Sequence, residues 1–284
     1  MATFYNQATL SYNGNTTTSN ITTGELVEVL SATKTAVQTE YQQDDTLTYV
    51  VNILNSGNTT MTGVTISDNL GAYTLNTLTL VPMDYVVGTV RYYVGGVLQP
   101  TPTVTAGPPL TISGLSVPAK GNVTVIYQAK TNDYAPLAQE SSITNTATIN
   151  ANNIANPITA SATVNAYSEP VLRISKSLTP TTVSENGQLT YTFIIQTYGN
   201  TAADEAAALI VSDRFDPILN PITVAFNGTA WTEGTEYTYD ATTGQFVSTA
   251  GIITVPAASY TQDAATGAIS IVPGSATLTI TGTV

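Results

Sequence analysis

Three residue types recur at matching places in the chain, and together they could join two side chains through an amide bond. Lys34 and Lys176, two of the four lysines, lie 142 residues apart. An aspartate follows each of them near the end of a later strand-like segment, Asp68 and Asp213, and Asn145 completes the first set. A buried, neutral lysine is a nucleophile, and a protonated carboxyl polarises the carbonyl of an asparagine side chain.

Most other chemistry is excluded by composition. The chain has no histidine and no cysteine, which removes histidine bases, thiolate nucleophiles and zinc sites of the usual kind. The acid pairs 44–45 and 204–205 lack the ligand spacing of a calcium loop. We therefore expect no catalytic residues, no metal and no cofactor, and we do not expect an enzyme.

The net charge of −12 bears on possible partners. An acidic surface repels phosphate backbones and anionic lipids, so we expect no nucleic-acid partner. No apolar stretch approaches the length of a membrane span, and the first residues do not form a signal peptide, so membrane insertion is not expected.

One module is present twice. The residues around Lys34 resemble those around Lys176, and residues 46–53 (TLTYVVNI) resemble 188–195 (QLTYTFII). The turn at 57–59 is repeated at 199–201. All three pairs have the same offset of 142 residues. The segment ending at Asp68 is repeated in the segment ending at Asp213 after a three-residue insertion.

The ends of the two modules do not match. Module one continues into a closing pair of segments, residues 143–149 and 159–164, and the second module has no counterpart before residue 284. A similar segment lies instead at the start of the chain, where residues 5–10 (YNQATL) resemble residues 144–149 (TNTATI). Residues 1–26 therefore resemble the closing hairpin of a module whose body is elsewhere.

Residue patterns predict an all-β fold. The chain is rich in Thr, Val, Ile and Tyr, and apolar residues alternate along 46–54, with turn signals such as Gly95-Gly96 between short segments. We predict two tandem immunoglobulin-like β-sandwich modules, the second lacking its closing strands, plus an N-terminal donor hairpin. The predicted boundaries are 1–28 for the donor hairpin, 29–168 for module one and 169–284 for module two.

A sandwich without its last strands exposes unpaired backbone groups, and an isolated hairpin is marginal in water, so each defect can be cured by the other through strand addition. We expect the chain to polymerise with itself, head to tail. The donor residues of this prediction are Phe4, Tyr5, Asn6, Ala8, Leu10, Tyr12 and Ile21. The acceptor edge is predicted at Leu278, Ile280 and Val284. The alternative is a fragment cut from a longer tandem array.

Residues 34–70 (KTAVQTEYQQDDTLTYVVNILNSGNTTMTGVTISDNL) and their second copy from Lys176 resemble the bacterial surface repeat catalogued as domain of unknown function eleven. Asp44-Asp45 stands where that repeat often has Gly-Asp, and residues 72–116 and 216–271 diverge from it. The resemblance implies a structural or adhesive role on a bacterial surface.

The Lys–Asp–Asn sets also resemble the self-forming isopeptide sites of Gram-positive pilins and adhesins. That resemblance implies one bond between Lys34 and Asn145 beside Asp68, and a second between Lys176 and Asn6 of a neighbouring copy beside Asp213. The alternative is that the lysines are edge-strand charges and that the aspartates make local turns.

These observations favour the structural subunit of an extracellular filament, on the surface of a cell or a spore. The lack of a leader favours a spore appendage assembled inside a mother cell. The alternative function is an adhesin or S-layer-like surface module whose divergent loops bind a host or surface ligand.

Overall fold

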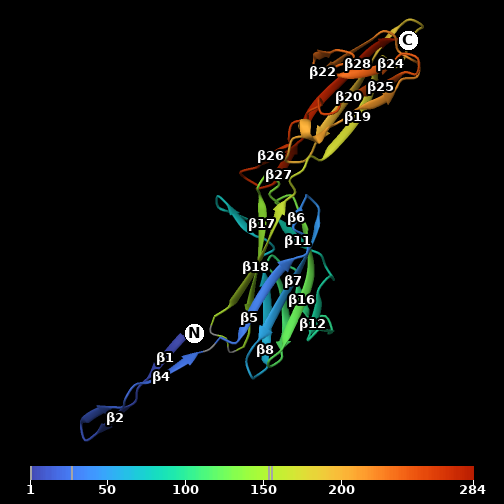
Figure 1. Ribbon diagram of the computed structural model, residues 1–284. Helices are drawn as coiled ribbons and strands as arrows, with labels where there is room; N and C mark the ends of the chain where they lie inside the picture. The colour runs from blue at the N-terminus through green and yellow to red at the C-terminus, as the bar shows by residue number, and fades with distance from the viewer. Residues whose placement is uncertain (1, 27, 153, 155) are drawn as a thin grey trace.

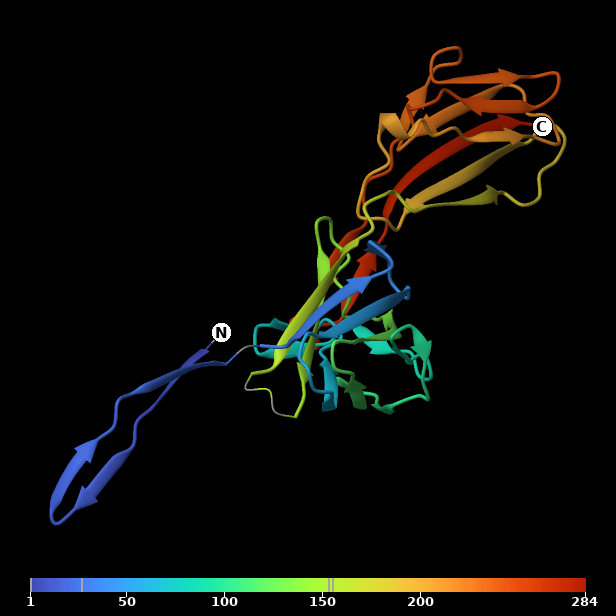
Figure 2. The same cartoon turned by 60° about the horizontal axis from the view of Figure 1, so that its bottom comes forward.

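The computed structural model describes residues 2–26, 28–152, 154 and 156–284. The chain forms an elongated molecule of three parts in a row (Figure 1, Figure 2). An N-terminal hairpin (residues 2–26) extends from one end of module one (29–168), and module two (169–284) lies at the other end. Within the described residues no helix is both long and apolar enough to span a bilayer.

The N-terminal hairpin stands away from the rest of the molecule (Figure 2). Its turn is Asn13-Gly14, and both residues have the positive φ that a tight two-residue hairpin turn requires. At the base of the hairpin, β1 (Ala2–Asn6) pairs with β4 (Thr22–Leu26). Next to the turn, β2 (Thr9–Tyr12) pairs with β3 (Asn15–Thr18).

Module one is a sandwich of two mainly antiparallel sheets. The first sheet contains, in spatial order, β13 (Val97–Leu98), β12 (Arg91–Val94), β16 (Asn122–Thr131), β7 (Thr46–Asn55) and β5 (Leu30–Ala36), with β11 (Met83–Tyr85) also paired to β16. The second contains β14 (Thr103–Thr105), β15 (Leu110–Val117), β8 (Met61–Asp68), β17 (Ser142–Asn150), β18 (Ile158–Ala166) and β6 (Glu40–Tyr41). A short hairpin, β9 (Tyr73–Leu75) and β10 (Leu78–Leu80), lies outside both sheets.

Alternation along the strands builds the core of module one. In β7, Leu47, Tyr49, Val51 and Ile53 are all fully buried, while the residues between them face outward or are partly covered. This period of two is the pattern of a strand with one face on the core. Strands β5, β7 and β16 share one sheet, and β8, β17 and β18 share the other. This is the arrangement of an immunoglobulin-like sandwich.

Strands β17 and β18 close module one. Strand β17 lies between β8 and β18, with Ala147 opposite Asp68 and Ile149 opposite Ile66. Strand β18 also lies against β5 of the facing sheet. The closing pair therefore completes one sheet and covers the first strand of the other.

Module two repeats the early strands of module one. Its larger sheet contains β19 (Leu172–Thr179), β20 (Gln188–Thr197), β28 (Gly274–Thr283), β22 (Ile222–Phe226) and β23 (Thr229–Trp231). Its smaller sheet contains β21 (Ser212–Arg214), β25 (Gln245–Ser248) and β24 (Tyr237–Asp240). The remaining elements are the hairpin of β26 (Ser259–Gln262) and β27 (Ile269–Val272) and a single 3₁₀ turn, Glu205–Ala207.

The closing strands of module one have no counterpart within residues 169–284, all of which are described. Strand β21, the equivalent of β8, pairs only with β25 among the described strands. The edge strand β19 is exposed over nearly its whole length, whereas its equivalent β5 alternates between buried and exposed residues. The predicted fold, with an unclosed second sandwich, is confirmed.

The predicted acceptor edge is wrong. Leu278 and Ile280 lie on β28, which is hydrogen-bonded to β20 on one side and to β22 on the other, and both side chains are buried in the core. Val284 is bonded through its backbone to Asn186 and Gly187. The last strand of the sequence is thus central in its sheet. The edge strands of the two sheets are β19 and β23 in the larger and β21 and β24 in the smaller, and β21 is the one that lacks the counterpart of β17.

The junction between the modules is braced by direct contacts. Asn200 is buried, and its Nδ2 donates to the carbonyl oxygen of Leu137 at 3.0 Å. The hairpin of β26 and β27 reaches module one, where Gln262 Nε2 donates to the hydroxyl of Tyr73 at 2.7 Å. Asn200 and the hairpin of β26 and β27 therefore hold the two modules together.

Candidate functional site

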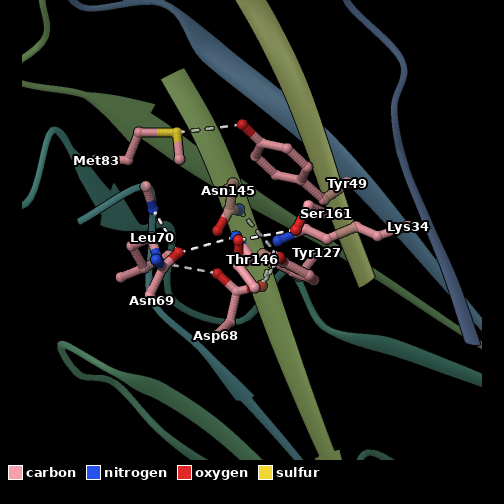
Figure 3. Close-up of polar contacts among 11 residues, drawn as sticks. Lys34, Tyr49, Asp68, Asn69, Leu70, Met83, Tyr127, Asn145, Thr146 and Ser161 are labelled. Atoms are coloured by element: carbon pink, nitrogen blue, oxygen red, sulfur yellow. Dashed lines mark hydrogen bonds and ion pairs between the residues drawn. The ribbon is translucent and has the colours of Figure 1, made fainter. Parts of the chain in front are cut away.

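The structure brings Lys34, Asp68 and Asn145 together inside module one (Figure 3). The Lys34 Nζ donates to Asp68 Oδ2 at 2.5 Å, and neither side chain has any exposed surface. Lys34 comes from β5, Asp68 from the end of β8, and Asn145 from β17. Three strands that are far apart in sequence thus place an amine, a carboxyl and a carboxamide in one closed space.

Tyr127 connects the acid to the amide. Its hydroxyl donates to Asp68 Oδ2 at 2.5 Å and accepts from Asn145 Nδ2 at 3.3 Å. The carbonyl oxygen of the Asn145 side chain is buried and has no hydrogen-bond partner among the described residues. An unpaired buried acceptor is energetically costly, so a hydrogen bond from a protonated neighbour to this oxygen would be favourable.

Burial controls the charge of this set. Desolvation lowers the pKa of Lys34 to about 8, and the nearby Asp68 carboxylate offsets only part of that effect. The ring centroids of Tyr49 and Tyr127 lie 4.8 Å and 5.8 Å from the Lys34 Nζ. Burial also raises the pKa of the Tyr127 hydroxyl, so Tyr127 remains a neutral hydrogen-bond donor.

Module two contains an equivalent lysine–aspartate pair, but within residues 169–284 no strands equivalent to β17 and β18 cover it. Lys176 lies opposite Phe193 as Lys34 lies opposite Val51, and its Nζ contacts Asp213 Oδ2. Here 38% of the lysine side chain and 20% of the aspartate side chain are exposed. Ile280 occupies the place of Tyr127, because it pairs with Tyr191 as Tyr127 pairs with Tyr49.

The predicted donor residues are all exposed on the N-terminal hairpin. These residues are Phe4, Tyr5, Asn6, Ala8, Leu10, Tyr12 and Ile21. In β17 the buried positions are Ile143, Asn145, Ala147 and Ile149. The alignment of Asn6 with Asn145 gives the corresponding series Phe4, Asn6, Ala8 and Leu10. The hairpin therefore carries the same alternation of apolar, amide, small and apolar residues.

Strand β4, which returns alongside β1 in the N-terminal hairpin, is comparable with β18. Asn6 pairs with Thr22 and Phe4 with Gly24, whereas Asn145 pairs with Ala162 and Ile143 with Val164. Each hairpin has one small residue at these partner positions, Gly24 in the first and Ala162 in the second, whereas Thr22 and Val164 are larger.

Sequence reasoning found the lysines, the aspartates and Asn145 but missed the tyrosines of the site. The signal for Tyr49 was present in the repeated Leu-Thr-Tyr segment, which also contains Tyr191. No comparable signal marked Tyr127. Among the described residues no group of acidic side chains is arranged to hold a metal ion.

No family model matches the chain, and no curated protein matches it. Among solved structures, the pilus backbone RrgB from Streptococcus pneumoniae is 14% identical and aligns over 86% of this chain and 55% of its own, with a TM-score of 0.35. This chain thus spans about half the length of that protein. The major pilin BcpA from Bacillus cereus is 12% identical, covers 96% of this chain and 73% of its own, and has a TM-score of 0.37.

Another similar structure is the major pilin SpaD from Corynebacterium diphtheriae, which is 14% identical, covers 78% of this chain and 50% of its own, and has a TM-score of 0.38. A family 123 glycoside hydrolase from Clostridium perfringens also aligns, with 10% identity, coverage of 49% and 27%, and a TM-score of 0.31.

Proposed function

We propose that this chain is a non-catalytic filament subunit that polymerises head to tail, its N-terminal hairpin completing module two of the next copy. One observation carries the proposal: the exposed hairpin repeats the buried residue pattern of β17, and module two has an open place where β17 and β18 would lie. An added strand would satisfy the unpaired edge of β21 and cover the apolar face of β19.

Module one supplies the expected register of the joint. Because Ala147 lies opposite Asp68 and Ile149 opposite Ile66, Ala8 should lie opposite Asp213 and Leu10 opposite Val211. The same register carries Asn6 to the position beside Lys176 that Asn145 has beside Lys34. The hairpin and the open module lie at opposite ends of the molecule, so the contact is heterologous and repeats without closing.

The polar set of module one is suited to an amide bond between Lys34 and Asn145. A proton moves from Lys34 Nζ to Asp68 Oδ2, which gives a neutral amine and a carboxylic acid in an apolar interior. The acid donates to the unpaired Asn145 oxygen, Nζ bonds to the side-chain carbon of Asn145, and the bond from that carbon to Nδ2 breaks. The second proton of the amine goes to Nδ2, which leaves as ammonia, so no oxidant or cofactor is required.

The equivalent bond in the filament would join Lys176 to Asn6 of the partner subunit. Asp213 would act as Asp68 does, and the bond would make the polymer covalent. An assembly of this kind fits an extracellular filament on a cell or spore surface, in keeping with the resemblance to the bacterial surface repeat.

The experiment compares two neighbouring residues of the hairpin. Phe4 and Tyr5 are both more than half exposed in the free chain, so neither supports the fold of the single subunit. The register turns Phe4 toward the core of the joint and Tyr5 toward solvent, as Ile143 and Thr144 are turned in β17. We expect Phe4→Asp to abolish filaments and Tyr5→Asp to retain them, as seen by electron microscopy and sedimentation.

Equal assembly by both variants would refute completion by the hairpin. A wild-type chain that stays monomeric at all concentrations would instead favour a module from a longer array or a surface-binding role.

A further inference from the structure

The same Lys–Asp pair occupies two different environments in one chain. Lys34 and Asp68 have no exposed side-chain surface, whereas 38% of Lys176 and 20% of Asp213 are exposed. The strands that carry the two lysines pair with their neighbours in the same register. The difference in burial therefore does not come from these strands.

The difference comes from what covers them. In module one, β17 pairs with β8 beside Asp68, and β18 lies against β5, which carries Lys34. In module two the corresponding face of β19 consists of Leu172, Ile174, Lys176 and Leu178, of which only Leu178 is partly covered. Apolar residues on both sides of Lys176 would bury its side chain once a hairpin lies over them.

Burial decides whether the lysine can react. A solvated ammonium has no free electron pair, and only the neutral amine attacks a carbonyl carbon. Burial in module one lowers the pKa of Lys34 to about 8, so part of that lysine is neutral near physiological pH. In the free chain, by contrast, 38% of the Lys176 side chain is exposed to water.

We infer that the arriving hairpin is also the switch for the reaction, so that Lys176 becomes a nucleophile only after Asn6 of the partner subunit has docked beside it. This inference rests on the proposed function. One proton of the Lys176 ammonium passes to Asp213, the Nζ bonds to the side-chain carbon of Asn6, and the bond from that carbon to Nδ2 breaks. A second lysine proton goes to Nδ2, which leaves as ammonia. Cross-linking is thereby restricted to correctly registered joints.

The first test measures the accessibility of Lys176 in full-length chains that cannot form the bond. Asn6→Ala chains are assembled, and Phe4→Asp/Asn6→Ala chains stay apart; both are treated with an amine-acetylating reagent and analysed by peptide mass spectrometry. Lys130, whose side chain is 49% exposed, is the internal reference. We expect loss of acetylation at Lys176 in the filaments only, with Lys130 labelled in both. Equal labelling of Lys176 in both states would overturn the switch.

The second test follows covalent ladders in denaturing gels. Wild type should form ladders, whereas Phe4→Asp and Leu10→Asp, which keep both Asn6 and Lys176, should form none at the same concentration. Ladders from the undocked variants would overturn the switch. Wild-type filaments that never become covalent would overturn the bond but leave hairpin docking intact, and assembly of Phe4→Asp would overturn the proposed function itself.

Discussion

Module one and module two begin alike and end differently. Their first two strands share sequence and register, and each places a lysine beside an aspartate. Only module one has β17 and β18, and only its pair is sealed from water. The comparison links the burial of this polar set to the closing hairpin, which covers it in module one and is missing from module two.

Module two nevertheless has a core of its own. Phe215 and Phe246 are fully buried, and Tyr191 stacks on Phe215 with ring centroids 5.0 Å apart. The Lys176 Nζ lies 4.3 Å from the Tyr191 ring centroid. Aromatic side chains thus pack beside Lys176 in a module that lacks its last strands. In the proposed filament a docking hairpin would meet a preformed surface and would lose less free energy to reorganisation.

The largest expected contrast between the modules comes from removing the aspartates. In Asp68→Ala the amide cannot form, and a buried amine loses its partner, which costs about 3–5 kcal/mol relative to the unbonded Asn145→Ala variant. In an unassembled Phe4→Asp background, Asp213→Ala removes a partly exposed pair and should cost about 0–1 kcal/mol. Urea unfolding measures both, and equal losses would mean that closure does not set the environment.

Raising the pH should stabilise module one when the amide is absent. In Asn145→Ala, Lys34 is neutral in the folded state above about pH 8 but protonated in the unfolded state up to about 10.5. The unfolded chain then binds the extra proton, so stability should rise across this range, by at most about 3 kcal/mol. Asp68, Tyr49 and Tyr127 are the titratable groups around this lysine, and burial raises the pKa of both tyrosines.

Above about pH 10 those tyrosines oppose the gain, because the unfolded chain releases phenolic protons that the folded chain keeps. Stability should therefore pass through a maximum between about pH 9 and 10. The control is Lys34→Met in the same background, in which the rise should vanish. A flat profile in Asn145→Ala would show that burial does not penalise the charged lysine.

The smallest contrast concerns Asn58 and Asn200, which are equivalent in the repeat. Asn58 is exposed, whereas Asn200 is buried at the junction, where it bonds to Leu137. Asn200→Ala should cost about 1–2 kcal/mol because it leaves that carbonyl unpaired, and Asn58→Ala should stay within about 0.5 kcal/mol. Thermal unfolding measures the costs, and small-angle scattering should detect looser modules only in Asn200→Ala.

The fold and most of the polar set could be predicted because they depend on local and repeated patterns. The alternation of apolar and polar residues along 46–54 and the offset between Lys34 and Lys176 can both be read from the sequence. The acceptor edge could not be predicted in this way, because the order of strands in a sheet is set by long-range pairing. Strand β28 comes last in the sequence yet lies between β20 and β22. Tyr127 was missed for the same reason, since only the register across β7 and β16 brings it to Asp68.

The positions of the two lysines determine how a pulling force would travel through the proposed filament. Tension would pass from Asn6 along residues 6–34, cross the amide from Lys34 to Asn145, and continue along residues 145–176 to the next subunit. Residues 35–144 and 177–284 would lie outside this route. A stretched fibre would therefore transmit load through a short covalent thread, while most of each sandwich stayed folded beside it.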